Sequence, residues 1–130
     1  MIGTWIALRK AGLLGINERN LRLVNDLNPR RLMRLVNDKT ETKRLAIEAN
    51  IPTPELYGLI RNPLDMRNLD KLLDKPDGCV IKPANGSQGN GIQVILGPMR
   101  GGWRRSNGQR ALFEDLKFHV NNVLSGMYSL

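Results

Sequence analysis

The chain has 130 residues, enough for one compact domain with a single core, and its 41% hydrophobic and 25% charged residues are ordinary for a globular protein. It contains no apolar run near the roughly 18–20 residues of a membrane helix and no basic stretch of a signal peptide at its start, so we expect a cytoplasmic protein with no membrane partner. The net charge of +8 attracts polyanions, whether nucleic acids or polyphosphate nucleotides, and the single cysteine, Cys79, excludes an internal disulfide.

The first forty residues have a helical and basic pattern. Asn17 is predicted to cap a short helix that Asn28-Pro29 ends. Pro29 then suits the first position of a second helix, which reaches about Val36. We therefore interpret residues 1–37 as an N-terminal helical segment.

The clearest helix of the chain follows this segment. Asp38 is a good N-cap, and apolar side chains then recur at i, i+3, i+4 and i+7 until Asn50 and Pro52 stop the helix. Lys39 is expected at its first position, where the helix dipole disfavours a cation by roughly 0.3–1 kcal/mol. A bound anion would remove that penalty, so Lys39 is a candidate phosphate ligand. The ordinary alternative is that Lys39 contacts only solvent.

Mixed structure is predicted for the rest of the chain. Residues 55–60 are a predicted short strand, and Asn62-Pro63 is predicted to open a helix to about Leu73. The further predicted strands are residues 79–83, residues 92–96, which Gly97-Pro98 ends, and residues 103–106. Residues 112–124 are the last predicted helix. Helices combined with antiparallel strands give the fold class α+β, with N-terminal helices followed by a small antiparallel sheet.

A glycine-rich stretch, Gly86-Ser87-Gln88-Gly89-Asn90-Gly91, joins two of these strands, and Lys82 lies just before it. Glycines tolerate positive φ and let N–H groups approach an anion, while a lysine is a compact cation suited to phosphate. A P-loop or a dinucleotide fingerprint would open a helix, but here a strand follows. The stretch therefore predicts a flap over phosphates, and an ordinary glycine-rich hairpin loop remains the alternative.

Several short motifs follow one another along the chain: N-D-K-T-E-T-K-R-L at 37–45, A-N-I-P-T-P-E at 49–55, V-I-K-P at 80–83, and the glycine-rich stretch. In their order and spacing, these motifs resemble the ATP-grasp superfamily. Residues 15–20 and 28–31 resemble more narrowly the RimK-related alpha-L-glutamate ligase-like proteins. The likeness runs from about Gly12 to the end of the chain.

The resemblance implies the ATP-binding part of a carboxylate–amine ligase. ATP would phosphorylate the carboxylate of an amino acid or peptide, and an amine would then displace the phosphate to form an amide. Within a nucleotide-binding subdomain of residues 38–130, the resemblance assigns ATP binding to Lys39, Lys82, Ser87, Gln88, Gly89, Asn90 and Gly91.

The resemblance also implies Mg²⁺ as a cofactor. Its acidic and Asn ligands belong to a C-terminal half of the ATP-grasp domain that the sequence does not contain, and no catalytic residue is assigned. We therefore expect a truncated chain that is inactive alone and that self-associates through exposed apolar surface.

Two other classes of function remain open. A small basic nucleic-acid-binding module would bind polyanions with a steep salt dependence, although the aromatic residues that interleave with basic ones for base stacking are missing. A non-catalytic scaffold would keep the fold and bind no nucleotide. Outside the motifs, His119 is expected at a surface or boundary position, and Cys79 is expected to be a small buried strand residue.

Overall fold

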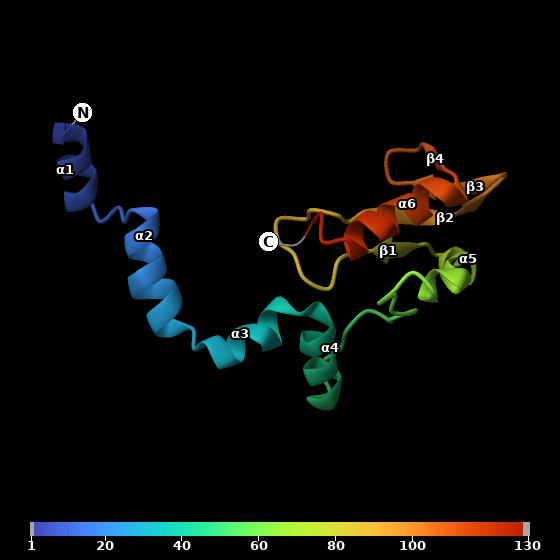
Figure 1. The fold of residues 1–130 in the computed structure, drawn as a ribbon, viewed down its shortest axis with the longest axis horizontal. Helices are drawn as coiled ribbons and strands as arrows, with labels where there is room; N and C mark the ends of the chain where they lie inside the picture. The colour runs from blue at the N-terminus through green and yellow to red at the C-terminus, as the bar shows by residue number, and fades with distance from the viewer. Residues whose placement is uncertain (1, 129–130) are drawn as a thin grey trace. The chain divides into compact units, whose positions relative to one another are not determined.

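The computed structural model describes residues 2–128. Their contacts divide the chain into two units, with the boundary between Val36 and Asn37. Helices combined with one four-stranded antiparallel sheet confirm the predicted α+β class (Figure 1). None of the described helices is both long and apolar enough to cross a membrane.

The first unit is built from short helices. They are α1 (Ile2–Lys10), α2 (Ile16–Arg19), the π-helical segment η1 (Asn20–Asn25) and α3 (Arg30–Asn37), whose last residue belongs to the second unit. The prediction that Asn17 caps the short helix before Asn28-Pro29 is wrong, because Gly15 is the N-cap of α2 and Asn17 lies inside it. The extended backbone of Gly15 starts the helix without any side-chain cap hydrogen bond.

The helix α4 (Lys39–Glu48) begins where the sequence predicts. Oδ1 of Asp38 accepts hydrogen bonds from the N–H groups of Thr40 at 2.8 Å and Glu41 at 3.4 Å, which satisfies two of the unpaired donors of the first turn. The helix ends before Asn50, whose φ of 55° is left-handed.

Residues 51–61 form no strand, so the strand predicted at residues 55–60 is wrong. The segment packs against its neighbours instead: the Leu72 side chain lies against the backbone of Gly58, and Nζ of Lys75 lies 4.9 Å from the centre of the Tyr57 ring. A strand needs a hydrogen-bonded neighbour, and the sheet edge β1 (Cys79–Ile81) pairs with β2 (Gln93–Met99) alone.

The sheet has the order β1-β2-β3-β4, with β3 (Gly102–Arg105) and β4 (Arg110–Ala111) completing it. The strands β1, β2 and β3 match predicted strands, whereas β4 was not predicted. The prediction that Gly97-Pro98 ends the second strand is also wrong. A bulge between Ile95 and Gly97 shifts the register there, so the strand absorbs these residues and continues to Met99.

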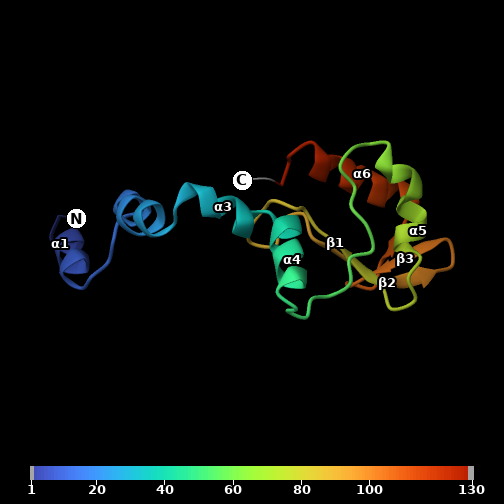
Figure 2. The same ribbon diagram turned by 90° about the horizontal axis from the view of Figure 1, so that it is seen from below.

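Two helical elements cover one side of the sheet. Figure 2 shows α5 (Leu69–Leu73) and α6 (Phe113–Leu124) on this side. The helix predicted from Asn62-Pro63 is a turn followed by the 3₁₀ segment η2 (Asp65–Asn68) and then α5. The buried core lies between these elements and the sheet, and it consists of Met66, Leu69, Leu73, Ile95, Ala111, Leu116 and Val120.

The other side of the sheet exposes apolar side chains. Val80 and Val94 are register partners on β1 and β2, and they are 53% and 38% exposed. Leu96, two residues after Val94, is 42% exposed. Alternation along a strand places these side chains on one face, opposite the core residue Ile95. We call this surface the open face.

Candidate nucleotide-binding site

The glycine loop, defined here as residues 84–91, connects β1 to β2. The N–H of Asn90 donates to the Ser87 carbonyl at 3.1 Å, and the N–H of Ile92 donates to the Gly89 carbonyl at 3.2 Å, so the loop contains two overlapping turns. The turns require left-handed backbone at Gln88, Gly89 and Gly91, with φ of 58°, 78° and 73°. The predicted strand–loop–strand context is therefore confirmed.

The tip of the glycine loop, residues 87–90, is exposed. Within residues 2–128, the N–H groups of Ser87, Gln88 and Gly89 donate to no carbonyl or side chain. Successive free N–H groups in a glycine-rich turn form a favourable environment for an anion. The loop geometry is therefore compatible with phosphate binding.

The structure brings Lys39 to the start of the glycine loop. The Lys39 backbone N–H donates to the Ala84 carbonyl at 2.9 Å, and Nζ lies 2.9 Å from the Gly86 carbonyl oxygen and 3.5 Å from that of Ala84. These carbonyl dipoles favour a cation at a helix N-terminus, where the helix dipole alone would disfavour it. A residue 45 positions away in the sequence thus joins the loop.

Lys82 directly follows β1 and is exposed. Continued alternation after Val80 places Lys82 on the side of the open face. Its ammonium group has no hydrogen bond or ion pair with the part of the chain that the structure describes. The two lysines therefore differ: Lys39 is held by loop carbonyls, and Lys82 is free to meet a ligand.

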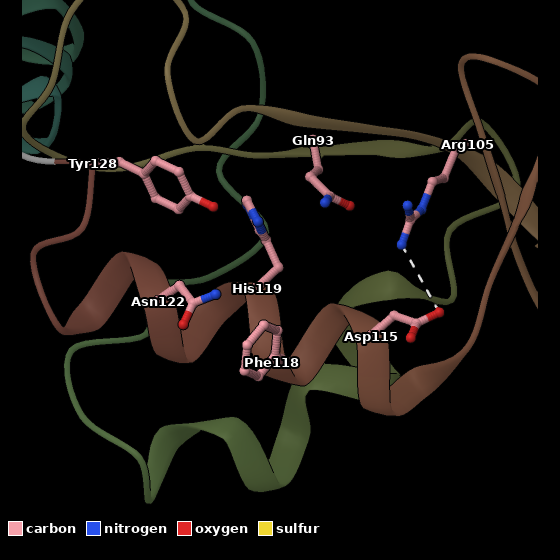
Figure 3. Close-up of a pocket in the computed structure, with 7 residues that line it drawn as sticks. All are labelled: Gln93, Arg105, Asp115, Phe118, His119, Asn122 and Tyr128. Atoms are coloured by element: carbon pink, nitrogen blue, oxygen red, sulfur yellow. Dashed lines mark ion pairs between the residues drawn. The ribbon is translucent and has the colours of Figure 1, made fainter.

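The far end of the glycine loop is held by residues that the sequence analysis did not select. His119 on α6 is only 8% exposed, and its Nε2 lies 3.0 Å from the Gly91 carbonyl oxygen. Because a carbonyl oxygen can only accept, Nε2 carries a proton. The rings of His119 and Tyr128 are 5.5 Å apart (Figure 3), and a side chain at Gly91 would meet the Tyr128 ring.

The prediction that His119 lies at the surface or boundary is therefore wrong. The helical period contained a usable signal, because His119 is three residues after the buried Leu116 and next to the buried Val120. It thus belongs to the inward face of α6.

Cys79 is half-buried on β1, and its burial raises the pKa of the thiol. A raised pKa lowers the fraction of thiolate at neutral pH, and the thiolate is the nucleophilic form. Cys79 therefore has the properties of a packing residue rather than of a catalytic thiol.

No cluster of three or more His, Cys, Asp or Glu side chains among the described residues is arranged to hold a metal ion. The Mg²⁺ implied by the ATP-grasp resemblance thus has no such ligand set here, and we derive no step through it.

A family model described as sugar-transfer associated ATP-grasp matches residues 18–130. A match of this extent, together with a glycine loop between antiparallel strands, defines an ATP-grasp protein, a class with ATP-dependent ligase-type function. Within that class the chain belongs to the sugar-transfer associated ATP-grasp family.

The resemblance to the ATP-grasp superfamily is thereby confirmed, while the narrower likeness to RimK-related glutamate ligases receives no support from the match. Searches of curated proteins and of solved structures found no match to the chain.

Proposed function

We propose that residues 38–130 bind the triphosphate of ATP between Lys39, Lys82 and the glycine loop, as the nucleotide-binding part of a carboxylate–amine ligase. In this reaction a carboxylate oxygen takes the terminal phosphoryl group of ATP and ADP leaves. An amine then attacks the acyl phosphate, phosphate leaves, and an amide forms.

The observation that best supports the proposal is the contact between Lys39 and the glycine loop. The ammonium group is held 2.9 Å from the Gly86 carbonyl oxygen, beside a loop tip whose N–H groups are free. A cation and free donors placed together suit a polyphosphate, because charge-assisted hydrogen bonds are the strong ones. Lys82 adds a second cation two residues before the loop.

Each part of the site has a distinct role in this proposal. Lys39 and Lys82 offset the negative charge of the phosphates, and Ser87, Gln88, Gly89, Asn90 and Gly91 form the flap that covers them. The exposed apolar side chains of Val80, Val94 and Leu96 provide a surface against which the purine base packs.

The substrate, the metal cofactor and the cellular location are further parts of the proposal. Glutamate as a substrate is supported by the motif likeness at residues 15–20 and 28–31 alone, so it is one carboxylate to be assayed among others. Mg²⁺ accompanies ATP in the proposal, as ATP-grasp proteins use it. A cytoplasmic location is also part of the proposal, because ATP is present there and a lone thiol stays reduced.

ATP binding is testable with the isolated chain by thermal unfolding with and without ATP. At an ATP concentration 100 times Kd, we expect stabilisation of about 2.7 kcal/mol. Lys39→Ala and Lys82→Ala each remove a hydrogen bond to a charged group, worth about 1.5–3 kcal/mol, and so weaken ATP binding about ten-fold or more.

Lys71→Ala is the matched control, because Lys71 is an exposed lysine on α5. Equal loss of ATP binding in Lys71→Ala would show general charge attraction and contradict the proposed site. The absence of any ATP effect at millimolar concentration would favour the non-catalytic scaffold. Tight DNA or RNA binding with a steep salt dependence, unchanged by Lys39→Ala and Lys82→Ala, would favour the nucleic-acid-binding module.

A further inference from the structure

A hollow lies on the helix-covered side of the sheet, between the sheet and α6 (Figure 3). This helix-side pocket has a volume of about 350 Å³, near the lower end of the roughly 300–1,000 Å³ typical of small-molecule sites. Its polar lining consists of Gln93, Arg105, Asp115, His119 and Asn122. Gln93 and Val94 are consecutive on β2, so the pocket and the open face lie on opposite sides of the sheet.

Two polar atoms that line the helix-side pocket lack a partner. Oε1 of Gln93, an acceptor, and Nε of Arg105, a donor, are both buried and form no hydrogen bond with any described residue. Buried polar groups in folded proteins are nearly always paired. An unpaired acceptor and an unpaired donor at one pocket indicate a ligand that both donates and accepts hydrogen bonds.

The charges of the helix-side pocket offset each other. Nη2 of Arg105 lies 3.9 Å from Oδ2 of Asp115, so the pair favours neither an anion nor a cation strongly. The side-chain amides of Gln93 and Asn122 each offer a donor and an acceptor on neighbouring atoms. A hydroxyl group also donates and accepts, so this lining suits an uncharged ligand with several hydroxyl groups.

One end of the helix-side pocket is aromatic. The Tyr128 ring lines the pocket and lies 5.5 Å from the His119 ring, with the two planes inclined at 38°. In Figure 3, Tyr128, His119, Gln93 and Arg105 follow one another along the gap between the strands and α6. The pocket therefore combines an apolar ring surface with hydrogen-bonding side chains, and a sugar ring presents both C–H groups and hydroxyl groups.

We propose that the helix-side pocket binds a monosaccharide unit. Hydroxyl groups of the sugar pair with Gln93, Arg105 and Asn122, and its C–H face packs against the Tyr128 ring. The proposal does not depend on the ATP site, because the residues that line the pocket are different from those proposed to hold ATP.

The test uses NMR of the whole chain, following the side-chain amide signals of Gln93, Asn121 and Asn122. The probes are D-glucose, D-galactose and N-acetyl-D-glucosamine, each added at increasing millimolar concentration. We expect at least one sugar to shift the Gln93 and Asn122 signals saturably while the Asn121 signal stays constant. Asn121 is the internal control, because it is the exposed neighbour of Asn122 on α6 and does not line the pocket.

Matched variants locate the binding. Asn122→Leu is expected to weaken the affinity for the sugar about three- to ten-fold, which is the effect of losing one hydrogen bond. Asn121→Leu is expected to leave the affinity unchanged. Arg105→Leu and its exposed neighbour Arg104→Leu form a second pair with the same expectation, which keeps the test decisive if Asn122→Leu does not fold.

Three outcomes would overturn the proposal. No sugar shifts the Gln93 and Asn122 signals, which would show that water alone satisfies the unpaired atoms. Acetate or malonate binds and the sugars do not, which would show an anion site. Asn121→Leu weakens sugar binding as much as Asn122→Leu does, which would place the bound sugar outside the helix-side pocket. An ATP thermal shift that persists in the Asn122 and Arg105 variants separates this site from the nucleotide site.

Discussion

The glycine loop offers a matched pair of positions for testing how tightly its end is packed. Gly89 and Gly91 have nearly the same left-handed backbone, with φ of 78° and 73°. A Cβ added at Gly89 would meet nothing within 4 Å, whereas one added at Gly91 would lie 2.7 Å from Cγ of Tyr128 and 2.9 Å from Cγ of Pro83. Alanine at the two positions therefore differs in steric contact and not in backbone strain.

The expected destabilisation follows from these two terms. Left-handed backbone costs an alanine about 1–2 kcal/mol at either position, and this term and the unfolded-state entropy cancel between the variants. The contacts at Gly91 add the cost of overpacking, about 1–3 kcal/mol. We therefore expect the free energy of unfolding of Gly91→Ala to be about 1–3 kcal/mol lower than that of Gly89→Ala.

Urea unfolding followed by far-ultraviolet circular dichroism measures this difference. A double variant with Tyr128→Ala isolates the ring contact, because truncation at Cβ removes Cγ of Tyr128 and leaves the contact with Pro83. We expect Gly91→Ala to cost less in the Tyr128→Ala background. Equal free energies of unfolding for Gly89→Ala and Gly91→Ala would refute the tight packing of Tyr128 on the loop.

Two further predictions concern His119 and Cys79. His119→Leu removes the donor to the Gly91 carbonyl and is expected to lower the free energy of unfolding by about 0.5–1.5 kcal/mol, whereas His119→Gln keeps an N–H donor. Amide hydrogen exchange at Gly91 and Ile92 should therefore become faster in His119→Leu alone. Equal exchange rates in the two variants would contradict the role of the hydrogen bond. Cys79, the single cysteine, should react with a disulfide reagent at pH 8 more slowly in the folded chain than in urea, because burial raises the pKa of its thiol and lowers the thiolate fraction. The stability contributed by the protonated thiol should in turn decline as the pH rises above its ordinary pKa of 9.0, and a folded chain that reacts as fast as the unfolded one would contradict this burial.

Local signals in the sequence predicted the elements that depend on nearby residues. Asp38 accepts hydrogen bonds from N–H groups two and three residues ahead, so the start of α4 was readable from the sequence. The segments on either side of the glycine loop were readable as strands for the same reason, because β-branched residues and glycines act within a few positions. The roles of Lys39, Lys82 and the loop in ATP binding stay predictions until they are measured.

Features that depend on distant partners could not be read in this way. The strand predicted at residues 55–60 had a suitable composition but no neighbouring strand, and β2 continued through Gly97-Pro98 because pairing with β3 holds it beyond the bulge. The helical period could have placed His119 on the buried face of α6, but its hydrogen bond to Gly91 could not be read from the sequence, because the two residues are 28 positions apart.

By itself, the sequence determined the α+β class, the start of α4, the strand–loop–strand order around the glycine loop, and the motifs that indicate an ATP-grasp protein. Only the tertiary structure decided that Lys39 meets Gly86, that His119 holds Gly91, and that Gln93 and Arg105 share a pocket with α6. The physical reason is range: caps, turns and strand propensities act over a few residues, whereas these contacts form only when segments far apart in the chain pack together.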